Sequence, residues 1–472
     1  MKTINYKNIF FYVLIIGGFS AVMYWFISLG SNLEQGKNIK VTVSEISFIE
    51  SLTRNLKSPL TILLAQIFVI ITVAKTFGWI CTRLKQPAVV GEMIAGIVLG
   101  PSLMGSYFPE FSAMLFPKQS FGNLQYLSQI GLILFMFIVG MELDLKVLKN
   151  KAKDAVIISH ASIIIPFTLG VGLAYFLYDK FAPGGVPFLS FCLFMGISMS
   201  ITAVPVLARI VQERSLQKTK LGTLVITCAA ADDITAWCIL AVVIAIVKAG
   251  SVGSSLYTIL FALSYVLIMV KIVRPLLKRI GSWHLADENL NKSFVIVYLM
   301  ILIMSSYTTE AIGIHALFGA FMAGAIMPED IKFRTLFIER LEDVALVLLL
   351  PLFFVFTGLR TQIGLLNEPY LWGMAAIIIA VAITGKFLGS ALAARFIGQN
   401  WKDSLTIGAL MNTRGLMELV VLNIGYDLGT LTPAVFSMMV IMALVTTLMT
   451  GPALDFINWI FKSKQEEVIP TT

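Results

Sequence analysis

The chain has 472 residues, of which 58% are hydrophobic and only 13% carry a charge. Together with a mean hydropathy of +0.88, this composition excludes a soluble globular domain and indicates an integral membrane protein. Membrane proteins carry an excess of Lys and Arg in their inner loops, and this excess is the first explanation to test for the net charge of +8. No nucleic-acid partner is expected.

Apolar runs long enough to cross a bilayer follow one another along the chain. A helix needs about 20 residues to span roughly 30 Å of hydrocarbon, and a window of that length predicts an all-α protein with about 13–14 transmembrane helices. The predicted spans cover residues 9–29, 60–80, 88–104, 122–142, 155–178, 187–208, 221–247, 256–270, 293–309, 311–327, 344–359, 370–394, 404–426 and 433–460.

The distribution of Lys and Arg predicts the orientation of these spans. With the amino terminus inside, about 24 of the 35 basic residues lie in inner segments and about 8 in outer ones. Both termini are then cytoplasmic, the loop at 182–186 is outside and that at 146–153 is inside. Lys2 and Lys7 precede the first span as in a signal peptide, but that run is long and lacks a clean cleavage site, so we expect an uncleaved anchor.

Three domains are predicted from this layout. Residues 1–57 form an anchor helix and an external loop, residues 58–460 form the transmembrane domain, and residues 461–472 form a short cytoplasmic tail. Lys75 lies near the inner end of its span, where a lysine can extend its amine to the interface, so it needs no special role. We expect a multi-pass protein of the cell membrane, the bacterial inner membrane in particular.

The sequence CAAADDITAW places Asp232 and Asp233 inside a stretch that has no other charge from Leu221 to Val247. They lie about a dozen residues, or roughly 18 Å, from the inner end of their span, near the bilayer centre. Two adjacent carboxylates in a low dielectric need a proton, a cation or a basic partner. Lys386 in AITGKFLGS and Thr202 in SMSITAVPVLARI lie at similar depth, so an ion site at the membrane midplane is predicted.

Two spans contain features that break helices at this depth. Pro205 interrupts one of them, and Gly415 lies beside polar residues in the other. Each broken span is the fifth in a set of six, and the two sets enter the membrane from opposite sides. This is the arrangement of inverted repeats with two discontinuous helices, which is typical of transporters that bind substrate at the midplane.

Other polar residues in the spans have two interpretations. Thr202 is either an ion ligand or a packing residue that bonds to its own helix. Glu92 is either a packing residue or part of an access route, and His315 is expected to be a hydrogen-bonded packing residue. Arg414 and Glu418, four residues apart, are expected to form a structural pair that stabilises the second break. The site is expected to be supported by Ser200, Asn412, Arg414, Glu418 and Glu92.

Seven segments in order resemble one family. They are QPAVVGEMIAGIVLGPSLMG, GLILFMFIVGMELDLKVL, SITAVPVLARI, AADDITAW, GIHALFGAFMAGAIMP, PLFFVFTGL and MNTRGLMELVVLNIGYDLG. Together they resemble the monovalent cation:proton antiporters, in particular the branch of bacterial sodium/proton antiporters, Kef-type systems and plant cation/proton exchangers. The resemblance covers residues from about 60 to 460.

The resemblance implies roles for the site residues. Asp233 would be the main ligand of the cation and the proton, Asp232 would pair with Lys386, and Thr202 would lie beside the site. Asp233, Asp232 and Thr202 would thus hold the monovalent cation. Ala203 stands where some relatives have a second polar residue, which leaves the ion preference open, whereas the sequence ADD matches sodium-type, often electrogenic members.

The resemblance also implies the sodium/proton antiporter fold. A core formed by helices at 155–247 and 370–460, with two crossed broken helices, would lie beside a dimerisation scaffold formed by helices at 60–142 and 293–360. Transport would move the core against this scaffold in a homodimer. Residues 461–472 contain no nucleotide-binding domain, so a Kef-type potassium efflux system, the alternative, would need its regulatory subunit in a separate chain.

We therefore expect a secondary active antiporter of Na+ and/or K+ against protons. A carboxylate that holds either a proton or a cation couples the two fluxes by competition when the site alternates between the two faces of the bilayer. The expected partners are the cation, the proton, the lipid bilayer and a second copy of the chain, and no cofactor is expected. The sequence lacks HExxH, GxSxG and GxGxxG motifs, so an intramembrane enzyme is disfavoured.

Overall fold

The computed structural model describes residues 6–34, 48–84, 86–142, 152–216, 219–249, 252–282, 292–328 and 331–466. Within these ranges the chain is nearly all helical and contains no strand. The prediction of an all-α protein is confirmed. Most of the predicted inner loop at 146–153 and residues 467–472 of the predicted tail lie outside the described residues.

The chain divides into two compact units, Met1–Thr61 and Ile62–Thr472. The first unit contains α1 (Tyr6–Glu34) and α2 (Phe48–Leu56). The apolar stretch of α1 from Phe10 to Gly30 is long enough to cross a bilayer.

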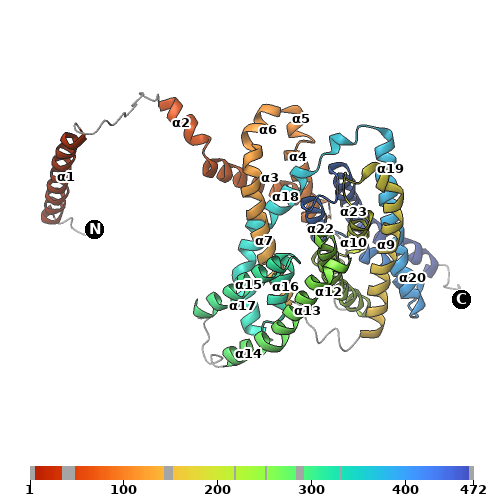
Figure 1. Cartoon of the computed structure of the whole chain (residues 1–472). Coiled ribbons are helices and arrows are strands. Elements are labelled where there is room, and N and C mark those ends of the chain that lie inside the picture. The colour runs from red at the N-terminus through yellow and green to blue at the C-terminus, as the bar shows by residue number, and fades with distance from the viewer. Residues whose placement is uncertain are drawn as a thin grey trace. The chain divides into compact units, whose positions relative to one another are not determined.

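The second unit contains the remaining helices (Figure 1). They are α3 (Pro59–Arg83, which begins at the end of the first unit), α4 (Ala88–Leu99), α5 (Met104–Tyr107), α6 (Pro109–Leu115), η1 (Lys118–Ser120), α7 (Phe121–Glu142), α9 (Ala152–Phe181), α10 (Phe188–Ser200), α11 (Val204–Glu213), α12 (Lys220–Ala249), α13 (Val252–Ile268), η2 (Met269–Val273), α14 (Arg274–Ser282), α15 (Lys292–Ile312), α16 (Ala316–Ala325), α17 (Ile331–Glu342), η3 (Asp343–Leu349), α18 (Leu350–Arg360), η4 (Ile363–Leu365), α19 (Pro369–Ile383), η5 (Thr384–Leu388), α20 (Gly389–Phe396), α21 (Trp401–Met411), α22 (Leu416–Asp427) and α23 (Pro433–Glu466).

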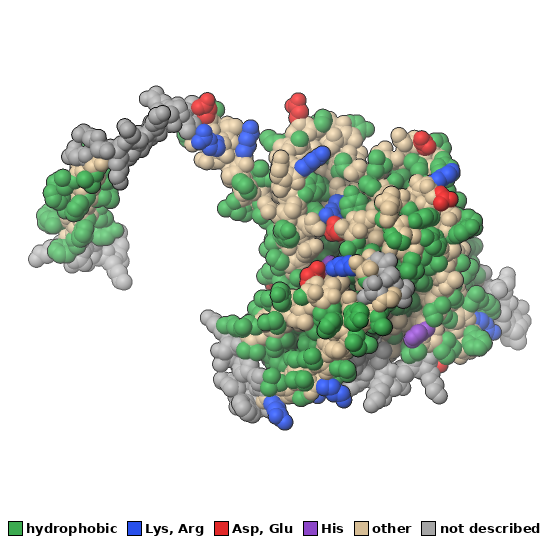
Figure 2. Space-filling view, viewed as in Figure 1, with side chains coloured by type: hydrophobic (Ala, Val, Ile, Leu, Met, Phe, Trp, Pro, Cys, Tyr) green, Lys and Arg blue, Asp and Glu red, His purple; other side chains and the backbone are tan. Residues whose placement is uncertain are grey.

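The apolar helices reproduce the predicted spans. In the described ranges, 12 helical segments are long and apolar enough to cross a membrane, and the bent pair α21 and α22 raises this number to 13. The shorter apolar helix α16, of 10 residues, lies within the predicted span at 311–327. Hydrophobic side chains dominate the face of the second unit that Figure 2 shows, as expected of a surface in contact with lipid.

Both predicted helix breaks are present. Residues 201–203 are not helical and separate α10 from α11, whose first turn contains Pro205. Residues 412–415 separate α21 from α22, and these two helices are bent by 42°. Proline fits the first turn of a helix because its missing N–H would have no partner there. Each broken helix is the fifth of its six spans, which confirms the inverted-repeat arrangement.

Close contacts at glycine occur within each of the two predicted sets of helices in the second unit. We call the helices within residues 60–142 and 293–360 the scaffold group, and those within 155–247 and 370–460 the core group. A Cβ atom on Gly358 of α18 would lie 2.5 Å from the backbone of Gly96 in α4, and one on Gly324 of α16 would lie 2.1 Å from the carbonyl of Phe137 in α7. Small residues allow membrane helices to approach this closely.

The core group has glycine contacts of the same kind. A Cβ on Gly170 of α9 would lie 2.9 Å from Gly196 of α10, and one on Gly408 of α21 would lie 2.6 Å from the carbonyl of Phe387. Every described glycine whose Cβ would come closer than 3.0 Å to a neighbour meets a helix of its own group. Figure 1 shows α3, α7, α15 and α17 on one side of the second unit and α9, α19, α20 and α23 on the other.

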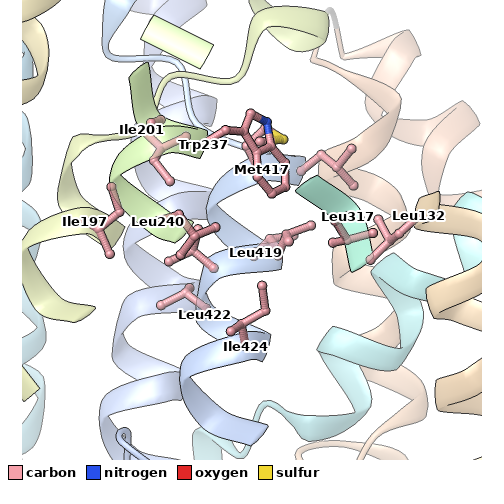
Figure 3. Close-up of a cluster of buried hydrophobic side chains, with 14 of the residues drawn as sticks. Leu132, Ile197, Ile201, Trp237, Leu240, Leu317, Met417, Leu419, Leu422 and Ile424 are labelled. Carbon is pink, nitrogen blue, oxygen red and sulfur yellow. The ribbon is translucent and has the colours of Figure 1, made fainter. Parts of the chain in front are cut away.

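Larger side chains fill the boundary between the two groups. Leu132 of α7 and Leu317 of α16 belong to the same buried cluster as Leu240, Met417 and Leu419 of the core group (Figure 3). At the same boundary the ring of Trp237 stacks on that of Phe321, with centroids 6.4 Å apart. The boundary is thus packed by side chains, whereas the contacts within each group include close backbone approaches at glycine.

Candidate ion-binding site

The two helix breaks cross and satisfy each other's backbone groups. The amide of Ala203 donates to the carbonyl of Thr413 at 3.0 Å, and the hydroxyl oxygen of Thr202 lies 3.2 Å from the carbonyl oxygen of Met411. A Cβ on Gly415 would lie 3.0 and 3.2 Å from side chains at the start of α11. A larger residue at position 415 would push the breaks apart, which explains why the second break contains glycine.

Two basic side chains bind the carbonyl end of α10. The guanidinium of Arg414 donates to the carbonyls of Ser198 at 3.0 Å and Met199 at 2.7 Å, and the amine of Lys386 donates to the carbonyl of Ser200. The last carbonyls of a helix have no partner within the helix and carry partial negative charge. Both basic residues are fully buried, so they neutralise this helix end inside the protein.

Lys386 lies on the π-helical turn η5, which interrupts the α-helical path between α19 and α20. Gly385 lets this turn pack closely on α9, since a Cβ there would lie 3.0 Å from Pro166. The amine of Lys386 also donates to the carbonyl of Ser162 on α9 at 3.0 Å. Single π-turns often occur at functional sites, and this one directs the lysine toward the helix crossing.

Asp232 accepts four hydrogen bonds. Its Oδ1 accepts from the hydroxyl of Ser159 at 2.8 Å. Its Oδ2 accepts from Thr202 at 2.6 Å, from Ser162 at 3.2 Å and from the amine of Lys386 at 2.9 Å. Asp232 and Lys386 are both fully buried. A buried carboxylate is stable when opposite charge and hydrogen bonds satisfy it, and Asp232 has both.

The neighbouring carboxylate has a different environment. Asp233 is 3% exposed, and its Oδ1 has no hydrogen-bond partner among the described residues. The side-chain oxygen of Asn412, at the second break, is likewise buried and without a partner. Buried acceptors of this kind require an explanation, because most buried polar atoms in proteins are satisfied. Of the aspartate pair, therefore, Asp233 is the member with an oxygen available for a ligand.

The other predicted residues fall into two sets. Arg414 and Glu418 are fully buried and 3.3 Å apart, although neither carboxylate oxygen of Glu418 is oriented for a hydrogen bond. Ser200 contributes its carbonyl to Lys386, while its hydroxyl bonds to the carbonyl of Gly196 in its own helix at 2.6 Å. These residues lie at the helix crossing.

Glu92 and His315 are not in contact with this cluster. The carboxylate of Glu92 pairs with the amine of Lys75 at 3.2 Å, within the scaffold group. Lys75 thus has a partner that the sequence analysis did not provide. His315 caps the start of α16, where its Nδ1 accepts from the amide of Leu317 at 3.4 Å.

Sequence reasoning missed Ser159 and Ser162. They lie three residues apart within the span predicted at 155–178, so both side chains point to the same side of α9. This spacing of two hydroxyl groups in an apolar helix is the signal that could have identified them. Single serines in a transmembrane helix usually bond to their own helix, and for that reason they draw little attention.

Comparison with known proteins identifies the family. The family described as "Sodium/hydrogen exchanger, transmembrane" matches residues 49–459. The chain belongs to the sodium/hydrogen exchanger family. Its members are transporters and not enzymes, so both the resemblance to the cation:proton antiporters and the expectation of a transporter are confirmed. The chain is a multi-pass membrane protein.

Individual relatives agree with this assignment. The Na+/H+ antiporter NhaS4 of Synechocystis is 43% identical over 83% of this chain and 96% of its own length. Cation/H+ antiporter 17 of Arabidopsis thaliana is 40% identical over 84% of the chain, and K+/H+ antiporter 1 of Saccharomyces cerevisiae is 34% identical over 84% of it. The chain spans about half the length of these two relatives, 48% and 46% respectively.

The fold is also similar to that of a solved structure. The sodium proton antiporter MjNhaP1 of Methanocaldococcus jannaschii at pH 8 matches 85% of this chain and 99% of its own, with a TM-score of 0.65 and 14% identity. At this level of identity the match concerns the fold alone. The prediction of the sodium/proton antiporter fold is confirmed.

Proposed function

We propose that the protein exchanges a monovalent cation, Na+ or K+, for protons, with Asp233 as the group that binds one or the other. The observation that carries this proposal is the asymmetry of the aspartate pair. Asp232 accepts bonds from four donors, whereas Asp233 has a buried oxygen without a partner. A carboxylate that can hold a proton or a cation, but not both, makes each ion displace the other.

The cation ligands would all be oxygen atoms, which suit a hard ion. Asp233 would supply the charge, and Thr202 and Asp232 would lie beside it. Lys386 would balance the charge of Asp232 and would not bind the ion. Arg414 and Glu418 would stabilise the crossing, and Ser200 and Asn412 would support it. Relatives named as Na+/H+ and K+/H+ antiporters support both cations as substrates.

The movement would occur at the boundary between the scaffold and core groups. Glycine contacts hold each group together, while larger side chains meet between them. The core group would carry Asp233 across the membrane midplane by moving against the scaffold group, which would form the contact of a homodimer. The charge bias of the loops supports an orientation with both termini in the cytoplasm, and we propose the bacterial inner membrane as its location.

The substitution Asp233→Asn tests this function. Asparagine keeps the shape of the side chain but cannot hold a proton in exchange for a cation, so cation-dependent proton flux should be lost. Purified protein in liposomes with an internal pH dye is exposed to Na+, K+ and Li+ in turn. Asp455→Asn, which removes a carboxylate far along the chain on α23, is the matched control and should retain exchange. Substantial exchange by a folded Asp233→Asn protein would refute the assignment.

A further inference from the structure

A cleft opens between the scaffold and core groups at the end of the molecule where α7 begins and where α18 and α22 end. Its cavity volume is about 30 Å³, which is room for about one water molecule. The charge bias of the loops predicts that this end faces the outside of the cell. Its polar lining consists of Gln125, Ser128, Gln129, His315, Arg360, Asn423 and Asp427.

A network of polar side chains crosses this cleft. Arg360 of α18 donates to Asp427 at 2.7 Å and to the side-chain oxygen of Asn423 at 3.2 Å, both on α22. The amide of Asn423 donates to the hydroxyl of Thr357 at 2.8 Å, and Gln125 of α7 donates to Asp427 at 3.0 Å. Each of these bonds joins a helix of the scaffold group to the core helix α22.

The central ion pair is better fixed than a typical surface pair. The side chain of Arg360 is 13% exposed and that of Asp427 is 33% exposed. The guanidinium also lies over the ring of Phe356, 4.3 Å from its centroid, and 5.5 Å from that of Tyr426. The guanidinium is planar and already positioned by the rings, so it loses little conformational entropy when it pairs with the carboxylate. The pair therefore contributes more to stability than a fully exposed pair would.

The apolar lining of the cleft separates it from the ion site. Leu132, Leu317 and Ile424 line the cleft and belong to the buried cluster that also contains Trp237 (Figure 3). Trp237 lies one helical turn after Asp233 on α12. Apolar side chains of this cluster thus lie both at the cleft and one turn from Asp233, and apolar layers of this kind block ions by excluding water.

We propose that Arg360, Asn423 and Asp427 form an outer latch, which holds α22 of the core against α18 of the scaffold while this cleft is closed above the ion site. The latch rests on the proposed function, because it has to open when the core group moves to expose Asp233 to this side. Other ion pairs in the described residues behave differently. Arg214 and Asp455 are both in the core region, and Lys75 and Glu92 are both in the scaffold, so neither pair is broken by such a movement.

The latch is tested by the reactivity of a cysteine in the cleft. Ser128 lines the cleft, is 1% exposed and differs from cysteine by one atom. Ser128→Cys is made in a chain whose four cysteines have been replaced, and a membrane-impermeant methanethiosulfonate is added on the outer side of oriented membrane vesicles. Asp427→Asn and Arg360→Gln should each raise the reaction rate about tenfold, because each frees α22 from α18.

Three comparisons separate the latch from other causes. The two substitutions change the charge of the cleft in opposite directions, so a purely electrostatic effect on the reagent would give opposite changes in rate. The exchanged pair Arg360→Asp with Asp427→Arg should return the rate toward that of the parent. Asp455→Asn, which breaks the Arg214 pair within the core region, should leave the rate unchanged. If Asp427→Asn fails to fold, Thr357→Val removes the hydroxyl that accepts from Asn423, together with its bond to the carbonyl of Phe353 in the same helix, and should also raise the rate.

Equal rates in the parent and in the folded Asp427→Asn, Arg360→Gln and Thr357→Val proteins would overturn the latch. The thiol reaction is measured without a cation gradient, so its outcome does not depend on exchange. A protein that exchanges ions while these rates stay equal retains the proposed function and loses the latch. A protein whose rates rise as expected but which shows no exchange retains the latch as a closure of the cleft and loses the proposed function.

Discussion

The scaffold and core groups pack their helices by the same means but differ in what they bury. Of the six charged residues that are buried in the described part of the chain, five are in the core group, and only Glu92 is in the scaffold group. The five are Asp232, Asp233, Lys386, Arg414 and Glu418. Glu92 of α4 pairs with Lys75 of the neighbouring helix α3.

This difference indicates why both crossing breaks, at 201–203 and 412–415, occur in the core group. Buried charges need hydrogen-bonding partners, and intact helices have none to offer at mid-membrane because their backbone groups are already paired. Breaking α10 from α11 frees the carbonyls that Arg414 and Lys386 bind. In its described part the scaffold group has no such cluster of buried charges, and its helices pack closely through glycine.

The scaffold should be most sensitive to added volume. Gly358→Ala places a methyl group 2.5 Å from the backbone of Gly96, and because backbone cannot give way as a flexible side chain does, the protein should lose about 3 kcal/mol of stability or more. Thermal unfolding of the detergent-solubilised protein measures this. Gly172→Ala in α9, where nothing lies within 4 Å of the new methyl group, is the control. Equal melting temperatures for the two variants would contradict the expected sensitivity of the scaffold group to added volume.

The core should be most sensitive to loss of charge. Lys386→Gln removes the positive charge that pairs with Asp232 and should lower the free energy of unfolding by about 2–3 kcal/mol. The loss is smaller than for an isolated buried charge because three hydroxyl groups still donate to the carboxylate. We expect this variant to lose the dependence of exchange on membrane potential before it loses exchange, because one charge that moves with the core is removed.

The measurement for Lys386→Gln compares Na+-driven proton flux in liposomes with and without a potassium–valinomycin potential. Lys75→Gln removes the lysine that pairs within the scaffold and should leave the response to voltage intact. An active Lys386→Gln protein with the voltage response of the parent would show that this lysine carries no coupled charge. A parent protein without any voltage response would remove the basis for expecting an electrogenic exchanger.

The smallest effect is expected at the serines of α9. Ser159→Ala removes the hydrogen bond to Oδ1 of Asp232, and bonds to charged groups contribute about 1.5–3 kcal/mol. Because three donors remain on Oδ2, we expect a loss near the lower limit, about 1–2 kcal/mol. Ser264→Ala is the control, since that hydroxyl is exposed and bonds only to its own helix. Equal melting temperatures would mean that Ser159 does not stabilise the core.

The local features of the fold could be predicted from the sequence. Hydropathy is a property of a short stretch of chain, so the spans at 9–29 through 433–460 correspond to helices in the structure. The breaks beside Pro205 and Gly415 were also predictable, because the bonding of proline and the size of glycine act within one helical turn. The adjacent charges of Asp232 and Asp233 marked the site for the same reason.

Only the tertiary structure decided how these residues are connected. Lys386 reaches Asp232 across 154 positions of the chain, Ser159 reaches it across 73, and Arg360 reaches Asp427 across 67. Composition and periodicity report on neighbours along one helix and contain no information on which helices meet. The sequence by itself therefore determined an all-helical membrane protein with a charged, broken core. The packing of those helices decided that Asp232 is saturated with donors while Asp233 is not, since a buried carboxylate takes its partners from whichever helices surround it.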